Sequence, residues 1–267
     1  MLATAVTLQA QTSPKPTPTP SLEHEFFKNI LRDQKAIWTA PRHLDRSDVK
    51  WVVPGGIGLM ALFTTDRITG DEILDRQVRA SRTISYAGSV YGLGAVAGTF
   101  YLVGRTRKDD RARETGLLSA EALVDSVITG EALKGITQRA RPLDGVERSE
   151  FFDGGSSFPS GHSTQAWAVA TIIANEYRHR RTVQIAAYGI AGAVSVARFT
   201  GHKHYLSDVI AGSALGYGIG KFIYNTRHRE PLNTDDDDAI SKSAWPSITP
   251  QVNRQARRYG LSLTWNF

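Results

Sequence analysis

The sequence predicts an all-α protein, a helical bundle with one short strand near its C-terminus. Between Ile84 and Asn225 apolar residues recur at helical spacing, with little of the alternation typical of strands. Short polar or glycine-bearing links separate these segments, as loops separate packed helices. The chain of 267 residues is long enough to bury one hydrophobic core. We therefore expect one domain with tails.

The N-terminal segment is predicted to lie outside that domain. Met1–Ala10 is small and apolar and resembles the end of a secretory signal cleaved after Ala10, although the usual basic n-region is missing. A mis-assigned start codon or an unstructured N-terminus are the alternatives. Thr12–Pro20 contains four prolines, which favours an extended linker. The chain is thus divided into a leader and linker (1–20), a helical domain (21–230) and a tail (231–267).

Two segments open the helical domain. Ser21–Trp38 has apolar residues at helical spacing, with Ser21 as N-cap and Pro41 as stop, and we expect this helix to pack on the main body. Ile84–Gly104 is uncharged and rich in Gly, Ala and Ser. Its length suits a bilayer span, and its small residues also suit a buried central helix. The Arg105–Glu114 run that follows is predicted to be a charged loop.

Four further helices and one strand complete the prediction. The helices are expected at about Gly116–Ala140, Ser163–Arg178, Thr182–Arg198 and Ser207–Asn225. After Pro231 the acidic run Asp235–Asp238 indicates a solvated linker. In the last residues apolar and polar side chains alternate, as in a strand, with the apolar ones at Tyr259, Leu261, Leu263, Trp265 and Phe267.

Composition narrows the chemistry. The chain contains no cysteine, which excludes disulfides, thiolate metal sites and cysteine nucleophiles. Its formal net charge of +6 favours anionic partners such as phosphates, acidic lipid surfaces or nucleic acid, without choosing among them. A mean hydropathy of −0.27 argues against a chain dominated by membrane spans.

The first candidate group for chemistry is Lys134 with Arg141. The two residues stand seven apart, two helical turns, so both cations should project from one face near a helix end that Pro142 helps to define. Two cations on one face repel each other unless an anion lies between them or water screens them. The pair therefore indicates either an anion site or a solvated basic face.

The second group is the turn Pro159-Ser160-Gly161-His162, which leads into an apolar helix. Backbone N–H groups at a helix N-terminus and the Ser160 hydroxyl can bind phosphate oxygens, and Gly161 allows close approach. An imidazole at His162 suits proton transfer near neutral pH. The alternative is that Ser160 only caps the helix and His162 is an ordinary surface histidine.

The third group joins Arg198 to His204 and Asp208. His204 and Asp208 have i, i+4 spacing at the start of a predicted helix, which places imidazole and carboxylate on one face. A carboxylate that accepts the Nδ1 hydrogen leaves Nε2 free as a nucleophile. His202 lacks such a carboxylate and is expected to have a rim or structural role. A purely structural His–Asp hydrogen bond is the alternative.

Together the three groups resemble the type 2 phosphatidic acid phosphatase (PAP2) superfamily, which includes bacterial acid phosphatases, lipid phosphate phosphatases and vanadium haloperoxidases. The family pattern is Lys, six residues, Arg-Pro; then Pro-Ser-Gly-His; then Ser-Arg, five residues, His, three residues, Asp. The chain matches it at Lys134, Arg141, Pro142, Pro159, Ser160, Gly161, His162, Arg198, His204 and Asp208. Ala197 replaces the family's serine before the arginine, which we expect to tune activity rather than abolish it.

The resemblance implies a helical bundle of the PAP2 and haloperoxidase type that hydrolyses phosphate monoesters through a phosphohistidine. His204 would attack phosphorus, Asp208 would orient His204, and His162 would protonate the leaving oxygen and then activate water. No metal and no cofactor is expected. The implied ligands of the phosphate oxygens are Lys134, Arg141, Ser160, the Gly161 amide and Arg198. Such a set of cations and backbone donors also suits the charge that develops in phosphoryl transfer.

Three other functions stay open on the sequence. They are a vanadium-dependent haloperoxidase, a broad-range soluble periplasmic acid phosphatase, and a non-catalytic membrane protein that binds anions or lipids. We favour a lipid phosphate or an isoprenoid pyrophosphate as substrate and an exported, periplasmic or membrane-associated enzyme. No nucleic acid is expected as a partner, and the oligomeric state is left open.

Overall fold

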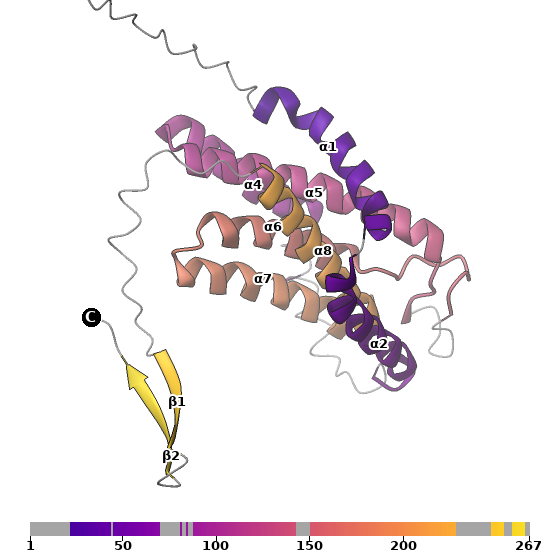
Figure 1. Ribbon diagram of the computed structural model, residues 1–267. Helices are drawn as coiled ribbons and strands as arrows, with labels where there is room; N and C mark the ends of the chain where they lie inside the picture. Colours follow the sequence, from indigo (N-terminus) through magenta and orange to yellow (C-terminus); the bar gives the residue numbers. More distant parts are fainter. Residues whose placement is uncertain are drawn as a thin grey trace, which may run out of the picture.

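The computed structural model describes residues 22–43, 45–69, 81, 84, 88–142, 150–227, 247–253 and 258–264. Its elements are α1 (Leu22–Thr39), the short 3-10 helix η1 (Ala40–His43), α2 (Arg46–Thr69), α4 (Val90–Arg107), α5 (Asp110–Thr137), α6 (Gly161–Glu176), α7 (Arg181–Thr200), α8 (Leu206–Arg227), β1 (Ser247–Asn253) and β2 (Arg258–Thr264) (Figure 1). The predicted all-α bundle is confirmed. The predicted signal, Pro-rich linker and acidic linker lie outside the described residues.

Helix α6 is the centre of the bundle and packs against α5, α7 and α8 (Figure 1). One apolar cluster joins α4, α5, α6 and α7 around Leu93, Leu123, Val169 and Val194. A second cluster joins α5, α6 and α8 through buried leucine and isoleucine side chains. Helices α6 and α8 pack so closely at Gly216 that a Cβ atom there would lie 2.0 Å from the Thr164 carbonyl oxygen.

Helix α2 is the element that the sequence prediction omitted. It contains Pro54 and three nearby glycines, residues that normally interrupt a helix. The helix contacts α8 and exposes large apolar side chains, with Trp51 75% and Met60 65% exposed. Its buried part lies towards its C-terminal end, where Asp66 is only 1% exposed. The local sequence does not favour this helix, and tertiary contacts at its C-terminal end help to stabilise it.

Two predicted boundaries are corrected. The expected charged loop at Arg105–Glu114 is wrong, because α4 continues to Arg107 and α5 begins at Asp110. Lys108 ends α4 in a left-handed conformation, and the Asp109 side chain caps α5 by accepting from the Ala112 amide. Charged residues thus form a tight interhelical corner instead of a loop.

The C-terminal strand prediction holds for β2, and the structure adds a second strand. β1 and β2 pair in antiparallel register, with Ile248 opposite Leu263.

The helix expected at Ile84–Gly104 corresponds to α4, which begins only at Val90, after an N-cap at Ser89. Among the described helices α7 has the length and apolar composition to cross a bilayer, a test that core helices of water-soluble proteins also pass.

Candidate active site

The connection between α5 and α6 is held by backbone hydrogen bonds. Gln138 ends α5 in a left-handed conformation, and Arg141 therefore lies beyond the helix. The expectation that Lys134 and Arg141 share a helix face is corrected accordingly. Residues after Glu150 bond back to the end of α5, for example from the Ser157 amide to the Arg139 carbonyl at 2.8 Å. This pairing fixes Ser157 beside the start of α8.

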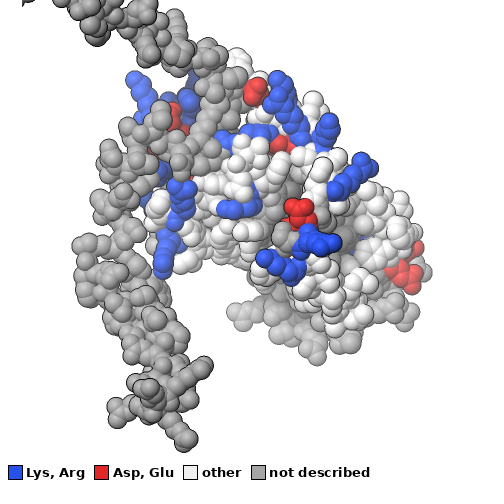
Figure 2. Space-filling view, viewed as in Figure 1, with Lys and Arg blue, Asp and Glu red and all other residues white. Residues whose placement is uncertain are grey.

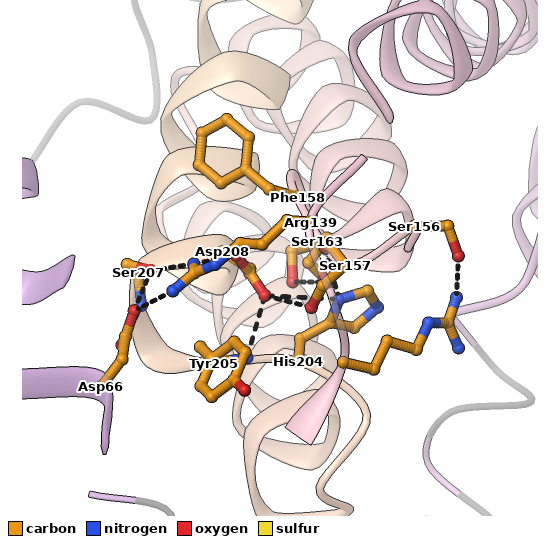
Figure 3. Close-up of polar contacts among 12 residues, drawn as sticks. Asp66, Arg139, Ser156, Ser157, Phe158, Ser163, His204, Tyr205, Ser207 and Asp208 are labelled. Atoms are coloured by element: carbon orange, nitrogen blue, oxygen red, sulfur yellow. Dashed lines mark hydrogen bonds and ion pairs between the residues drawn. The ribbon is translucent and has the colours of Figure 1, made fainter. Parts of the chain in front are cut away.

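His204 is the buried imidazole of the site, 2% exposed. Its Nδ1 lies 2.7 Å from the carbonyl oxygen of Ser157, which can only accept, so Nδ1 carries the hydrogen (Figure 3). Burial, followed by the charges of Arg198 and Arg141, holds the pKa of His204 well below its ordinary value. The ring is therefore neutral at pH 7, with the lone pair on Nε2 available to an electrophile.

Asp208 lies close to His204 but does not share its hydrogen, because Nδ1 is 3.9 Å from Oδ2. The expected direct hydrogen bond is thus corrected: His204 precedes α8, so the two residues do not stand one helical turn apart. Oδ2 of Asp208 accepts instead from the Ser157 hydroxyl at 2.5 Å and the Tyr205 amide at 3.0 Å. Ser157 is therefore the link between carboxylate and imidazole (Figure 3).

The three predicted phosphate-binding cations converge on the histidines. Lys134, Arg141 and Arg198 each lower the pKa of both His162 and His204 through their charge. Arg198 is 9% exposed, and its Nε has no hydrogen-bond partner among the described residues. Burial and then Arg141 lower the pKa of Arg198 to about 10. An anion between these side chains would satisfy the free donor and reduce the mutual repulsion.

The N-terminus of α6 completes the cradle. Ser160 precedes the helix, and its side chain makes no capping bond to the backbone; it accepts instead from the Ser163 hydroxyl at 3.1 Å. A Cβ atom at Gly161 would lie 3.0 Å from Lys134 Nζ, so glycine lets the ammonium approach the helix end. Lys134 Nζ also pairs with Glu131 at 2.6 Å. The Lys134 ammonium group and the N-terminus of α6 thus face the same region, which is the arrangement that an anion site requires.

His162 is half-buried at the first turn of α6. Burial lowers its pKa to about 4, and Arg198, Lys134 and Arg141 contribute further. The ring is therefore neutral while no anion offsets those charges. A bound phosphate would raise the pKa of His162 and favour its protonated form, which can donate a proton. His202 lies in the turn after α7, with a positive φ of 52°.

Sequence reasoning missed four residues that support the site: Asp66, Arg139, Ser157 and Ser207. Arg139 lies inside the first motif, where a charged side chain between Lys134 and Arg141 is expected to be solvated, yet it is 0% exposed. No local signal marks Asp66, because α2 was not predicted. Among the described residues the three acidic side chains near enough to share a metal ion are Asp33, Glu121 and Asp125, which belong to none of the three motifs.

Comparison with known proteins identifies relatives. Residues 115–231 match the family model of the PAP2 superfamily. The lipid A 1-phosphatase of Porphyromonas gingivalis is 36% identical over 70 residues, which make up 26% of this chain and 16% of that protein. A PA-phosphatase related-family protein of Dictyostelium discoideum is 28% identical over 145 residues, or 47% of this chain and 52% of that protein. The chain therefore spans about half or less of each relative.

Comparison with solved structures gives two matches. The first is a transmembrane PAP2 type phosphatidylglycerolphosphate phosphatase from Bacillus subtilis, with a TM-score of 0.48 and 20% identity, covering 78% of this chain and 98% of that chain. The second is Aquifex aeolicus LpxE, with a TM-score of 0.43 and 15% identity, covering 61% of this chain and 93% of that chain. The segment that is similar to the PAP2 superfamily, residues 115–231, contains all three motifs, from Lys134 to Asp208.

Proposed function

We propose that the protein is a metal-independent phosphatase that hydrolyses phosphate monoesters through a phosphohistidine at His204. The observation that carries the proposal is the state of His204: a buried, neutral imidazole whose Nδ1–H is held by the Ser157 carbonyl. That bond leaves Nε2 as the nucleophile in the same region as three cations. A site that only binds anions needs no such nucleophile.

The reaction proceeds in two displacements. In the first, Nε2 of His204 bonds to phosphorus, the bond from phosphorus to the leaving oxygen breaks, and protonated His162 gives that oxygen its proton. In the second, His162 takes a proton from water, the water oxygen attacks phosphorus, and the P–Nε2 bond breaks to release phosphate. Lys134, Arg141, Arg198 and the N-terminus of α6 stabilise the charge on the non-bridging oxygens in both steps.

A lipid phosphate or an isoprenoid pyrophosphate is the favoured substrate class. Large apolar side chains are exposed on two helices beyond the bundle core, including Trp51 and Ile57 of α2 and Ile185 and Ile190 of α7, each at least 61% exposed. Exposed apolar surface of this kind suits contact with a lipid surface. Basic side chains outnumber acidic ones on the face in Figure 2, which would favour acidic lipids. The relative from Porphyromonas gingivalis is named for its action on lipid A.

A burst experiment tests the covalent mechanism. An aryl phosphate has a good leaving group, so phosphoenzyme should form faster than it hydrolyses and release one aryl alcohol per active site before the steady state. The His204→Asn variant should show neither burst nor turnover, and His202→Ala should resemble the parent protein. Activity that survives His204→Asn would contradict the proposal. Activity should also persist in EDTA, and its loss would refute metal independence.

Substrate preference needs a separate comparison. Specific activity, as kcat/KM, should be higher on phosphatidic acid or an isoprenoid pyrophosphate in mixed micelles than on a soluble aryl phosphate. Vesicle flotation should show binding to membranes that contain acidic lipid. A clear preference for the soluble ester would overturn the lipid assignment and leave the covalent mechanism in place.

A further inference from the structure

We propose that Asp66 of α2 is a positioning residue for the nucleophile, acting on His204 through Arg139, Asp208 and Ser157. The inference rests on the proposed phosphatase function. Asp66 lies outside residues 115–231, which match the family model. The working site would therefore extend beyond the matched segment.

Asp66 is built into the base of the site rather than merely buried near it. Oδ2 of Asp66 accepts from Arg139 Nη2 at 2.8 Å, and Oδ1 accepts from the Ser207 amide at 3.2 Å. The Ser207 hydroxyl also donates to Oδ2. Figure 3 shows these contacts on the side of Arg139 opposite Asp208. One carboxylate thus joins the end of α2 to the first turn of α8.

Arg139 carries the contact from Asp66 to Asp208. Its Nη1 donates to Asp208 Oδ1 at 2.5 Å and to the Ser207 hydroxyl at 2.7 Å. The guanidinium carbon also lies 4.4 Å from the centre of the Tyr205 ring and 5.0 Å from those of Phe63 and Phe151. A planar guanidinium held by two carboxylates and aromatic rings has one favourable orientation.

Asp208 passes this orientation to the nucleophile. Its Oδ2 accepts the Ser157 hydroxyl, and the carbonyl of the same Ser157 accepts His204 Nδ1–H. Removing charge from Asp66 leaves Arg139 with Asp208 as its carboxylate partner among the described residues, so the guanidinium can turn towards Asp208 and compete with Ser157. The Ser157 carbonyl then no longer fixes the imidazole. Small displacements of a reacting group cost large factors in rate.

In the part of the chain that the structure describes, the hydrogen bonds of Lys134 and Arg141 go to residues outside this series of contacts. Arg141 bonds to Ser156 at 3.1 Å, and Lys134 pairs with Glu131. Loss of Asp66 should therefore slow the attack on phosphorus without weakening the binding of the phosphate group. This separation distinguishes a positioning role from a general contribution to folding.

The test compares Asp66→Asn with Asp48→Asn, a change of the same chemistry at the start of the same helix, where Asp48 Oδ2 accepts from the Asp45 amide at 2.9 Å. With an aryl phosphate, we expect the burst rate and kcat/KM of Asp66→Asn to fall about 30- to 100-fold, because both report the attack on phosphorus. Inhibition by inorganic phosphate should stay within about 2-fold, because it reports binding of the phosphate group. Asp48→Asn should match the parent protein.

A purely structural role predicts a different result: a lower burst amplitude, because fewer molecules fold, with an unchanged burst rate in those that do. That result overturns the inference. If Asp66→Asn does not fold, Asp66→Glu keeps the charge and displaces it by one methylene, and an unchanged burst rate in that variant also overturns it. The parent protein and His204→Asn are assayed in parallel. If His204→Asn is inactive while Asp66→Asn keeps the burst rate of the parent protein, the result rejects the role of Asp66 and leaves the proposed function in place.

Discussion

In each of two buried networks in the bundle, one arginine bridges two carboxylates. The networks differ in how completely hydrogen bonds satisfy the carboxylate oxygens. At the candidate site Arg139 joins Asp66 and Asp208. In the second network, between α1, α5 and α8, Arg227 joins Asp33 at 2.5 Å to Glu121 at 3.0 Å. The second also holds Asp125, whose Oδ1 accepts from Gln34 at 2.9 Å.

The charge balance separates the two. Both oxygens of Asp208 accept hydrogen bonds, whereas Asp33 Oδ2 and Asp125 Oδ2 have no partner among the described residues. Burial raises the pKa of Glu121 to about 8 and that of Asp125 to about 7. One arginine cannot offset three buried carboxylates, so the second network holds protons near neutral pH. Burial raises the pKa of Asp208 as well, so both networks make stability depend on pH, but in the first network hydrogen bonds hold both oxygens of Asp208.

The largest expected effect is at the reacting groups. His162→Ala should lower kcat about 10²- to 10⁴-fold on an alkyl phosphate, whose poor leaving group needs a proton. The burst rate with an aryl phosphate should change by less than about 10-fold, because that leaving group departs without one. Rapid-mixing kinetics on both esters would measure the difference. An equal loss of the bond-breaking step on both would contradict the role of His162 as general acid.

The second network should affect stability and leave catalysis intact. Arg227→Met removes the cation from three buried carboxylates and should lower the free energy of unfolding by about 3–5 kcal/mol. Urea unfolding measures this, with the exposed Arg181→Met as control, expected within about 0.5 kcal/mol of the parent protein. The burst rate per folded molecule should be unchanged. A slower burst would show that the two networks are coupled.

Glu121 should give stability a pH dependence of defined sign. Its pKa is about 8 in the folded protein and close to 4.5 when unfolded, so the folded state holds the extra proton between these values. The contribution of Glu121 to stability should therefore fall as pH rises from about 5 to 8, so the parent protein should lose more stability over this range than Glu121→Gln. Thermal unfolding at several pH values measures it. An equal dependence of stability on pH in the parent protein and in Glu121→Gln would disprove the assignment.

The smallest effect is expected at the phosphate cradle. Gly161→Ala places a methyl group 3.0 Å from Lys134 Nζ, the end of a flexible side chain that can shift. KM should rise about 10-fold, corresponding to about 1.4 kcal/mol, with a smaller change in kcat. Gly218→Ala on α8 is the matched control, since nothing lies within 4 Å of its added Cβ. Equal KM values in the two variants would count against the cradle.

Local sequence signals predicted the bundle and the motifs but not their supporting contacts. The apolar periodicity of α6 and α8 and the Pro-Ser-Gly-His turn are short-range features that can be read directly. Helix α2 was missed because Pro54 and its neighbouring glycines oppose helix formation in isolation. The bond from His204 to Ser157 joins residues 47 positions apart, which no spacing rule predicts.

The position of the phosphate on the imidazole tests the central claim most directly. Because the Ser157 carbonyl holds Nδ1–H, phosphate can be attached only through Nε2. Enzyme quenched during the burst with an aryl phosphate should yield an acid-labile, base-stable phosphopeptide that contains His204, and ³¹P NMR should identify Nε2-phosphohistidine. Phosphate on Nδ1, on another residue, or on no residue during an intact burst would contradict the account.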